Sequence, residues 1–189
     1  MSVSEMTASP ALASALRRLY FIRFAFAVVW AALLALTGGS AGAFLTILLV
    51  LYPLFDAAAV LWQLRSARDS QRAAASQWIN IVVSIIVAVA LGWASTISGS
   101  AALVVWGLWA IGAGIPQLVT AIRNRRSGGQ IPQMLSGGIS VFAGAAFLTQ
   151  GFQDSGTIIG VAGYALLGAI FFLISAIRLS IVLRTRASA

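Results

Sequence analysis

Apolar residues occur along this chain in long, nearly continuous runs that are separated by short polar stretches. Each run is about 20 residues long, which is the length that a helix needs to cross a hydrocarbon core of about 30 Å. The runs cover Leu19–Thr37, Ala43–Leu64, Trp78–Ser95, Ala101–Ile122, Met134–Gln150 and Gly156–Ile177. They do not alternate apolar with polar residues, as the strands of a membrane barrel do. The pattern therefore predicts an all-α membrane protein with six transmembrane helices.

The arginine-bearing ends of these runs recur at a constant interval. Thr120-Ala-Ile-Arg123 returns as Ser175-Ala-Ile-Arg178, 55 positions later, and Arg68 precedes Arg123 by the same 55 positions. We interpret this spacing as one helical hairpin written three times, at about 19–68, 78–126 and 134–186. Each copy is expected to contain an outward helix, a short outer turn and an inward helix that ends in arginines. Residues 19–186 would then form a single six-helix domain, whose parallel repeats differ from the inverted repeats of many transporters.

Residues 1–18 precede the first run and are interpreted as a cytoplasmic N-terminal segment. Ser9-Pro10 is typical of a helix start, with serine as the cap and proline at the first helical position. Leucines follow at helical spacing, so we expect a short amphipathic helix on the inner leaflet. A cleaved signal peptide is the alternative, because basic residues precede an apolar run. Cleavage would leave five spans and break the pairing of the helices, which favours a retained first span.

Composition and charge placement support the membrane assignment. Hydrophobic residues make up 60% of the 189 positions and charged residues only 8%, unlike a soluble globular domain. The basic residues are twelve arginines, and they lie at the termini and on alternate connections between spans. Because arginine excess marks the cytoplasmic side of short loops, both termini are predicted to be cytoplasmic. The arginines expected to set topology and to contact lipid headgroups are Arg65, Arg68, Arg123, Arg125, Arg126 and Arg178.

The expected surroundings follow from the same pattern. Arginine used without lysine, beside heavy use of alanine and glycine, is associated with GC-rich bacterial genomes. We therefore expect a multi-pass protein of the bacterial inner membrane, in contact with the bilayer and with anionic headgroups at the cytoplasmic face. The arginines bracket spans and form no patch on a soluble domain, which argues against a nucleic-acid partner. The sequence leaves a homo-oligomer and a membrane-protein partner open.

Two stretches carry a resemblance to a known family. Residues Gly107–Ile115, followed by Thr120-Ala-Ile-Arg123, resemble the inward helix of the short repeat in the HdeD-like acid-resistance membrane proteins. Gly137-Gly138-Ile139 with Gly144 is similar to the outward helix of that repeat. The resemblance implies a small six-span inner-membrane protein linked to survival at low pH, with no established catalytic residues. The first hairpin departs from the family pattern, because Asp56 stands near where the other hairpins have Gly112 and Gly168.

Asp56 is the acidic residue that the pattern places deepest in the membrane. It lies nine positions before Arg65, which is about 13 Å along a helix and close to the midplane. An unpaired carboxylate is costly there, so Asp56 should be protonated, paired or beside a wet cavity. Arg23 is the nearest candidate partner, and Asn80, Gln117 and Gln63 are candidates to line a polar path with Asp56. A structural aspartate is favoured over a proton-responsive group.

The chemistry available to the chain is narrow. It contains no cysteine and no histidine, which excludes disulfides, thiolate or imidazole metal ligation and histidine acid–base catalysis. We expect no catalytic, cofactor or metal site, and an enzyme acting on lipid-soluble substrates is the weakest alternative. The favoured hypothesis is a non-enzymatic HdeD-like protein in acid or envelope stress tolerance. A small proton-linked channel or carrier that uses Asp56 is the second hypothesis.

Small residues and tryptophans complete the expectations. Small residues let membrane helices approach closely, and the expected packing glycines are Gly112, Gly144, Gly160 and Gly168. Most of the tryptophans stand near the predicted ends of spans, so we expect them to anchor the helices at the membrane interface.

Overall fold

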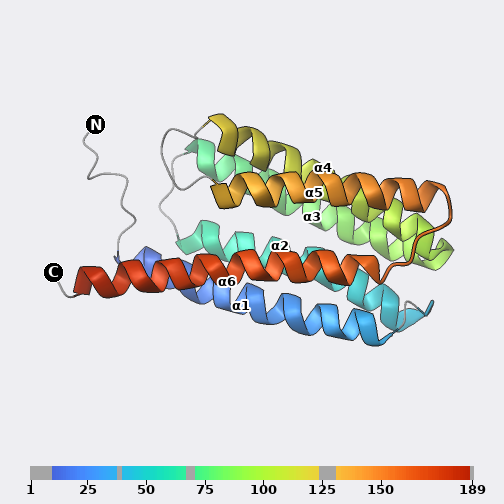
Figure 1. The fold of residues 1–189 in the computed structure, drawn as a ribbon, viewed down its shortest axis with the longest axis horizontal. Helices are drawn as coiled ribbons and strands as arrows, with labels where there is room; N and C mark the ends of the chain where they lie inside the picture. The colour runs from blue at the N-terminus through green and yellow to red at the C-terminus, as the bar shows by residue number, and fades with distance from the viewer. Residues whose placement is uncertain (1–9, 38–39, 67–70, 124–130, 188–189) are drawn as a thin grey trace.

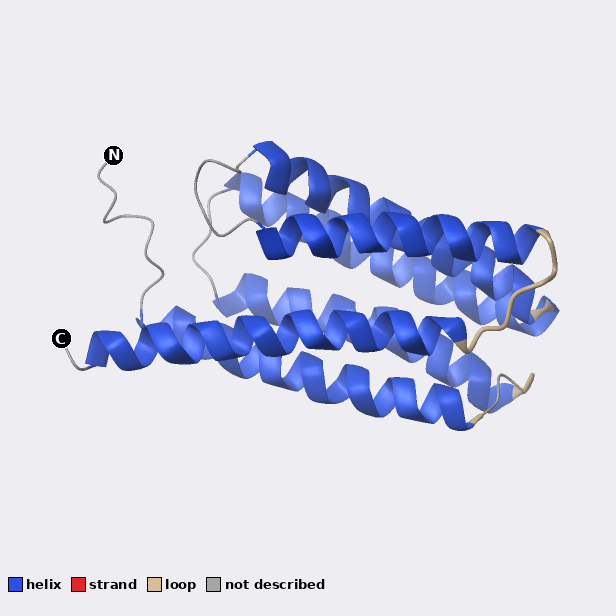
Figure 2. Ribbon diagram, viewed as in Figure 1, coloured by secondary structure: helices blue, strands red, loops and turns tan. Residues whose placement is uncertain are grey.

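The computed structural model of the chain describes residues 10–37, 40–66, 71–123 and 131–187. Within these ranges the chain is helical and contains no strand, as Figure 2 shows. All six helices are long and apolar enough to cross a membrane, which confirms the prediction of a six-span, all-helical protein. The helices are α1 (Pro10–Leu36), α2 (Ala43–Ser66), α3 (Gln71–Ile97), α4 (Gly99–Arg123), α5 (Ile131–Phe152) and α6 (Gly160–Ala187).

The first and last helices begin at different places from those expected. Helix α1 starts at Pro10 and continues without a break to Leu36, so the amphipathic helix expected near the N-terminus and the first span form one helix. Helix α6 begins at Gly160, four residues after the expected Gly156. Backbone hydrogen bonds over three residues, such as Gly160 N to Thr157 O at 3.1 Å, hold the preceding residues in a turn.

The helices form a closed ring in chain order. Each helix contacts the next one along the chain, and α6 returns to pack against α1. Successive helices run in opposite directions, so α1 begins and α6 ends at the same end of the bundle (Figure 1). Arg65 in the last turn of α2 and Arg123 in the last turn of α4 therefore lie at that end too. Arg68, Arg125 and Arg126 lie outside the described residues.

Close and loose packing alternate around this ring. The closest pairs are α2 with α3, α4 with α5, and α6 with α1, whereas α1 with α2, α3 with α4, and α5 with α6 make far fewer contacts. The connection between α2 and α3 and the one between α4 and α5 are the arginine-bearing ones. The two helices within each predicted hairpin therefore make few contacts with each other. Each helix packs mainly against a helix of a neighbouring hairpin.

Glycines explain why α4 and α5 approach so closely. A Cβ atom added to Gly107 would lie 2.7 Å from the carbonyl oxygen of Gly144, and one added to Gly144 would lie 2.7 Å from that of Gly107. Gly114 and Gly137 repeat this contact two turns away. The packing role expected for Gly144 therefore appears at the α4–α5 contact. Backbones this close gain dispersion contacts that lipid tails cannot supply.

The other three expected packing glycines do not act in this way. A Cβ atom at Gly112 or Gly168 would meet no heavy atom within 4 Å, so neither glycine mediates a close helix contact within the described chain. At Gly160 the added atom would meet only Phe147, at an ordinary 3.5 Å. The helix faces that carry Gly112 and Gly168 point away from neighbouring helices, and spacing along one helix does not reveal this.

Large aromatic side chains fill the centre of the ring. Trp30 of α1 stacks on Trp106 of α4, with ring centroids 5.5 Å apart, and Tyr52 of α2 packs edge-on against both rings. Trp30 also donates a hydrogen bond from Nε1 to the carbonyl oxygen of Leu48, at 2.7 Å. Both of these tryptophans are buried, so the expectation of interfacial anchoring is wrong for them. It stays a prediction for Trp62, Trp78 and Trp93, which are exposed.

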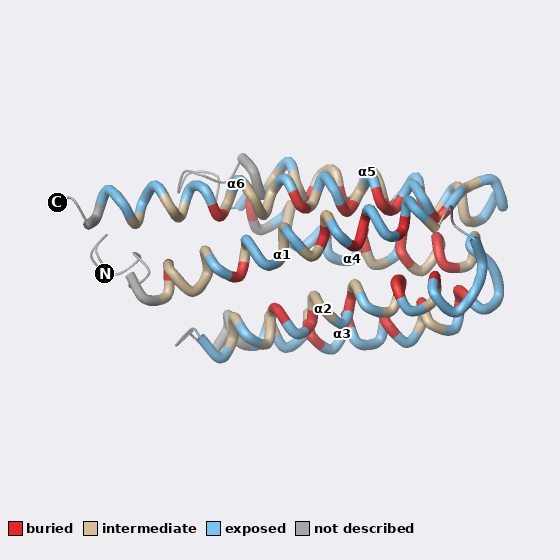
Figure 3. The backbone as a smooth tube through the Cα atoms, turned by 90° about the horizontal axis from the view of Figure 1, so that it is seen from below, coloured by how far each residue is buried: buried red, intermediate tan, exposed pale blue. Residues whose placement is uncertain are grey.

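Burial is distributed as a bundle in lipid requires. Buried and exposed positions alternate along the helices, except in the part of α6 after Ala176, where no described position is buried (Figure 3). The exposed side chains of α3 are mostly apolar and branched, including Val82, Ile86 and Val89. A surface of this kind is suited to contact with acyl chains and not with water.

Candidate functional site

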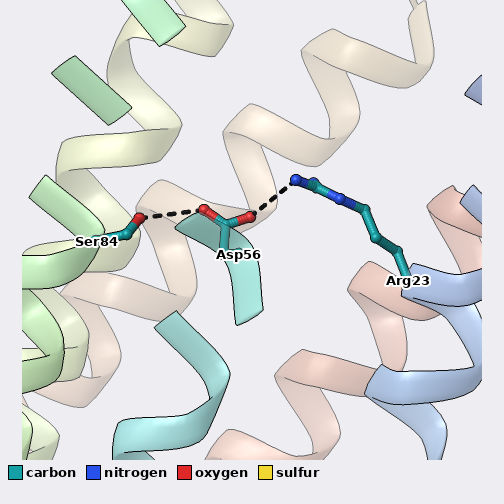
Figure 4. A network of polar contacts seen from close by, with 3 residues as sticks. All are labelled: Arg23, Asp56 and Ser84. Atoms are coloured by element: carbon teal, nitrogen blue, oxygen red, sulfur yellow. Dashed lines mark hydrogen bonds and ion pairs between the residues drawn. The ribbon is translucent and has the colours of Figure 1, made fainter. Parts of the chain in front are cut away.

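An ion pair lies in the middle of the bundle. Atom Nη2 of Arg23 on α1 is 3.3 Å from Oδ1 of Asp56 on α2. The other carboxylate oxygen, Oδ2, accepts a hydrogen bond of 3.1 Å from Oγ of Ser84 on α3. Figure 4 shows the carboxylate of Asp56 between these two partners. The three residues therefore connect α1, α2 and α3 through a single carboxylate, and Arg23 is the partner that the sequence predicted.

The guanidinium of Arg23 also contacts the sixth helix. Its Cζ atom lies over the ring of Phe172, 5.2 Å from the centroid, and Tyr20 stacks on the same ring at 6.3 Å. A cation over an aromatic face is attracted by the ring quadrupole, and more strongly where water is excluded. Arg23 is thus held from two sides, by a carboxylate of α2 and by an aromatic ring of α6.

A stacked aromatic pair lies one turn from this ion pair, at the loose joint between α1 and α2. The rings of Phe26 and Phe55 are nearly parallel, with centroids 3.7 Å apart. The side chains of Phe26 and Phe55 therefore fill the space between α1 and α2, whose backbones lie further apart than those of α4 and α5. The ion pair is only slightly accessible, with 12% of the Arg23 side chain and 23% of the Asp56 side chain exposed.

The immediate surroundings of the ion pair contain a cavity of about 30 Å³. The residues that line it come from α1, α2 and α6, and they are Arg23, Phe26, Tyr52, Phe55, Asp56 and Phe172. This volume is suited to about one water molecule. It is far below the several hundred Å³ that a small organic ligand occupies.

A second polar contact joins α5 to α6. The hydroxyl groups of Ser140 and Tyr164 are 2.9 Å apart, and the ring of Tyr164 packs edge-on against Phe147. The sequence analysis did not predict this contact between Ser140 and Tyr164.

Of the three amides predicted to line a polar path, Asn80 lies nearer to the Asp56–Ser84 contact than Gln117. Asn80 precedes Ser84 by one helical turn on α3, and its Oδ1 atom is buried without a hydrogen-bond partner among the described residues. Gln117 is half-buried on α4, which packs against α3 and α5. Within the described part of the chain, no hydrogen bond joins Gln117 to Asp56, Ser84 or Asn80.

The α2–α3 interface is apolar between Asp56 and the end of the bundle at which α2 begins. Ser95 of α3 donates a hydrogen bond of 2.9 Å to Thr46 of α2 near that end. Between this contact and the Asp56–Ser84 contact, Leu49 and Leu91 are fully buried. An open groove of about 520 Å³ lies beside Thr46 and Ser95, and its lining does not include Asp56. This groove therefore does not reach the carboxylate.

The interface is more polar toward the arginine-bearing end. Gln63 lies two turns after Asp56 on α2, and Gln77 lies two turns before Ser84 on α3, so both share the face of the Asp56–Ser84 contact. Their side chains are half-buried. Polar groups thus follow this interface on one side of Asp56, and apolar groups follow it on the other.

No protein-family model, no curated protein and no solved structure matches this chain.

Proposed function

We propose that the chain is a non-enzymatic, multi-pass protein of the bacterial inner membrane, of the HdeD-like type, that acts in acid or envelope stress tolerance. In this proposal Asp56 fastens helices together and is not a step on a transport route. The observation that carries it is the carboxylate of Asp56, which contacts both Arg23 and Ser84 beside a cavity of only about 30 Å³. A charge contacted from two sides is suited to fixing the positions of α1, α2 and α3.

The proposed topology places the arginine-bearing end of the bundle in the cytoplasm. Arg17 and Arg18 near the start of α1, Arg65 and Arg123 at the ends of α2 and α4, and Arg178 on α6 support this orientation. The same end would contact anionic headgroups. The regular alternation of close and loose helix pairs is what three copies of a two-helix unit would produce, and it supports the proposed threefold repeat.

A proton-linked channel or carrier is the second candidate, and one observation favours it. The half-buried Gln63 and Gln77, together with the unpaired Oδ1 of Asn80, give Asp56 polar neighbours on the arginine-bearing side. A carrier also needs a path to Asp56 from the other end of the bundle. Leu49 and Leu91 are fully buried on that side, which favours the non-transport role.

Two measurements test the proposal. The first is proton flux into liposomes that contain the purified chain or its Asp56→Asn variant, followed with an enclosed pH-sensitive dye after a pH step. We expect both samples to match protein-free liposomes. A flux that is raised by the unmodified chain and lost in the variant would establish the carrier instead.

The second measurement is survival of the source cells under acid and envelope stress, with the gene deleted and then restored. We expect deletion to lower survival and restoration to recover it, while growth at neutral pH is unchanged. Equal survival of deleted and restored cells under both stresses would refute the stress role, whatever the liposome result.

A further inference from the structure

The chain connects the three close helix pairs to one another at one end of the bundle only. Helix α1 leads into α2, α3 into α4 and α5 into α6 at the end where α2 begins, here called the Ser98 end (Figure 1). At the arginine-bearing end the chain joins α2 to α3 and α4 to α5, which are helices of the same pair. Toward the arginine-bearing end, the pairs are therefore held to one another by non-covalent contacts alone.

Helices α4 and α5 form one rigid body. Gly137, Gly144 and Gly151 of α5 recur at intervals of seven residues, and each of them faces α4. A Cβ atom added to any of the three would lie 2.7–2.9 Å from a backbone atom of α4. These contacts extend along about 21 Å of helix. Because backbones in direct contact do not separate through a change of side-chain rotamer, α4 and α5 move together.

The α4–α5 pair is held to α6 less firmly than the α2–α3 pair is held to α1. The ion pair of Arg23 and Asp56 joins the α2–α3 pair to α1. Of the joints around the described ring, the one between α5 and α6 brings two backbones close together least often. Side chains span this joint, because the hydroxyls of Ser140 and Tyr164 lie 2.9 Å apart and Phe147 meets the Tyr164 ring edge-on. A hydrogen bond between neutral groups is weaker than one that involves a charge, so this joint is the easiest to open.

The Ser98 end has the properties of a pivot for the α4–α5 pair. Ser98 alone separates α3 from α4. In the connection from α5 to α6, Asp154 accepts a hydrogen bond from Ser100 of α4. Gly156 of the same connection packs against Leu103 of α4 so closely that an added Cβ atom would lie 2.7 Å from the leucine side chain. Both links of the pair to the rest of the chain are therefore short or tied down at this end.

We propose that the α4–α5 pair swings as one body about the Ser98 end and opens the joint between α5 and α6 toward the bilayer, with the Ser140–Tyr164 hydrogen bond as its latch. Rigid-body motion of packed helices about a few terminal residues is a common form of conformational change. A rotation of about 10° would move Leu135, which lies about 25 Å along α5 from Phe152, by about 4 Å. The motion therefore predicts two arrangements of α5 and α6 that differ most toward the arginine-bearing end.

Distances between pairs of spin labels in lipid nanodiscs test the motion. The chain has no native cysteine, and Leu135, Ile174 and Ile115 are exposed, so each accepts a label on a substituted cysteine. Leu135→Cys with Ile174→Cys, across α5 and α6, should give two distances that differ by about 4 Å. Leu135→Cys with Ile115→Cys, within the α4–α5 pair, is the matched control and should give one. A single distance across α5 and α6, or two distances in both label pairs, would overturn the proposal.

Removal of the Tyr164 hydroxyl tests the latch with the same labels. Tyr164→Phe keeps the ring against Phe147 and should raise the ratio of the long to the short distance population about fivefold. Ser140→Ala removes the other hydroxyl and should have the same effect. Tyr20→Phe, in the close α1–α6 pair, is the matched control and should leave the ratio unchanged. An unchanged ratio in both latch variants, or an equal rise in the Tyr20→Phe control, would refute the latch.

Discussion

Arg23 on α1 and Asp56 on α2 form an ion pair, with 3.3 Å between Nη2 and Oδ1, at a joint where the backbones of the two helices seldom come close together. The glycine-lined contact between α4 and α5 needs no such connection, because backbone atoms themselves meet there. Two different kinds of contact thus hold the ring together, and they predict different responses to substitution.

Loss of one partner of the ion pair should be more harmful than loss of both. Arg23→Met or Asp56→Leu alone leaves an unpaired charge in the bundle, and we expect a loss of about 2–4 kcal/mol in unfolding free energy. The double variant should lose clearly less than the sum of the two. Reversible unfolding in mixed micelles measures all three variants. Arg178→Met, at an exposed position of α6, is the matched control and should change little. Additive effects of the two substitutions would contradict the ion pair.

Gly144 and Gly112 should respond in opposite ways to alanine. At Gly144 the new methyl group would lie 2.7 Å from both the carbonyl oxygen of Gly107 and a side-chain carbon of Ile111, so α4 and α5 must separate. We expect a loss of about 1–3 kcal/mol. At Gly112 the methyl group would meet nothing, and the higher helix propensity of alanine should leave stability unchanged or raise it by up to about 1 kcal/mol.

Thermal unfolding in detergent compares these two variants. An equal effect of alanine at the two positions would mean that α4 and α5 do not pack through Gly144.

Trp30→Phe should weaken the joint between α1 and α2 through one lost hydrogen bond. The Nε1 atom of Trp30 donates to the carbonyl oxygen of Leu48 at 2.7 Å, and a phenylalanine ring cannot replace this bond. We expect a loss of about 1 kcal/mol beyond that caused by the smaller ring. Trp109→Phe is the matched control, because Trp109 packs in the same aromatic cluster and makes no side-chain hydrogen bond to a described residue. Equal melting temperatures of the two variants would count against the bond.

The absence of native cysteine allows a direct test of orientation. Ser98→Cys lies between α3 and α4, and Arg123→Cys lies at the other end of α4. In intact spheroplasts, a membrane-impermeant maleimide should label the cysteine at position 98. It should label the cysteine at position 123 only after permeabilisation. Labelling of both positions from outside would overturn the proposed cytoplasmic placement of the arginines.

The sequence predicts the helices well because each span is an uninterrupted apolar run. Pro10 marks the start of α1, and the ends of α2 and α4 coincide with arginines. The predicted start of α6 lies four residues too early, because Gly156 belongs to an irregular stretch between α5 and the turn that precedes α6. A hydropathy run does not distinguish a first helical turn from a loop that is buried against other helices.

The contacts between helices were harder to predict. Arg23 was identified as the partner of Asp56 because it is the only other charged residue within the predicted first two spans. Which helices pack most closely was not evident, since it depends on where small residues of two different helices face one another. Gly112 and Gly144 look alike in the sequence, but only Gly144 faces a neighbouring backbone. Trp30 and Trp106 likewise look like interfacial residues until the ring of helices places them at its centre.

The close contact between α1 and α6 has a consequence for biogenesis. Helices α2 with α3, and α4 with α5, are joined by short connections and can pair as soon as they leave the insertion machinery. Helix α1 must wait for its close partner until the ribosome has delivered the 28 residues of α6. A nascent chain stalled before that point would expose the unpartnered flank of α1 to the bilayer, where quality-control proteases that survey unassembled membrane segments could recognise it.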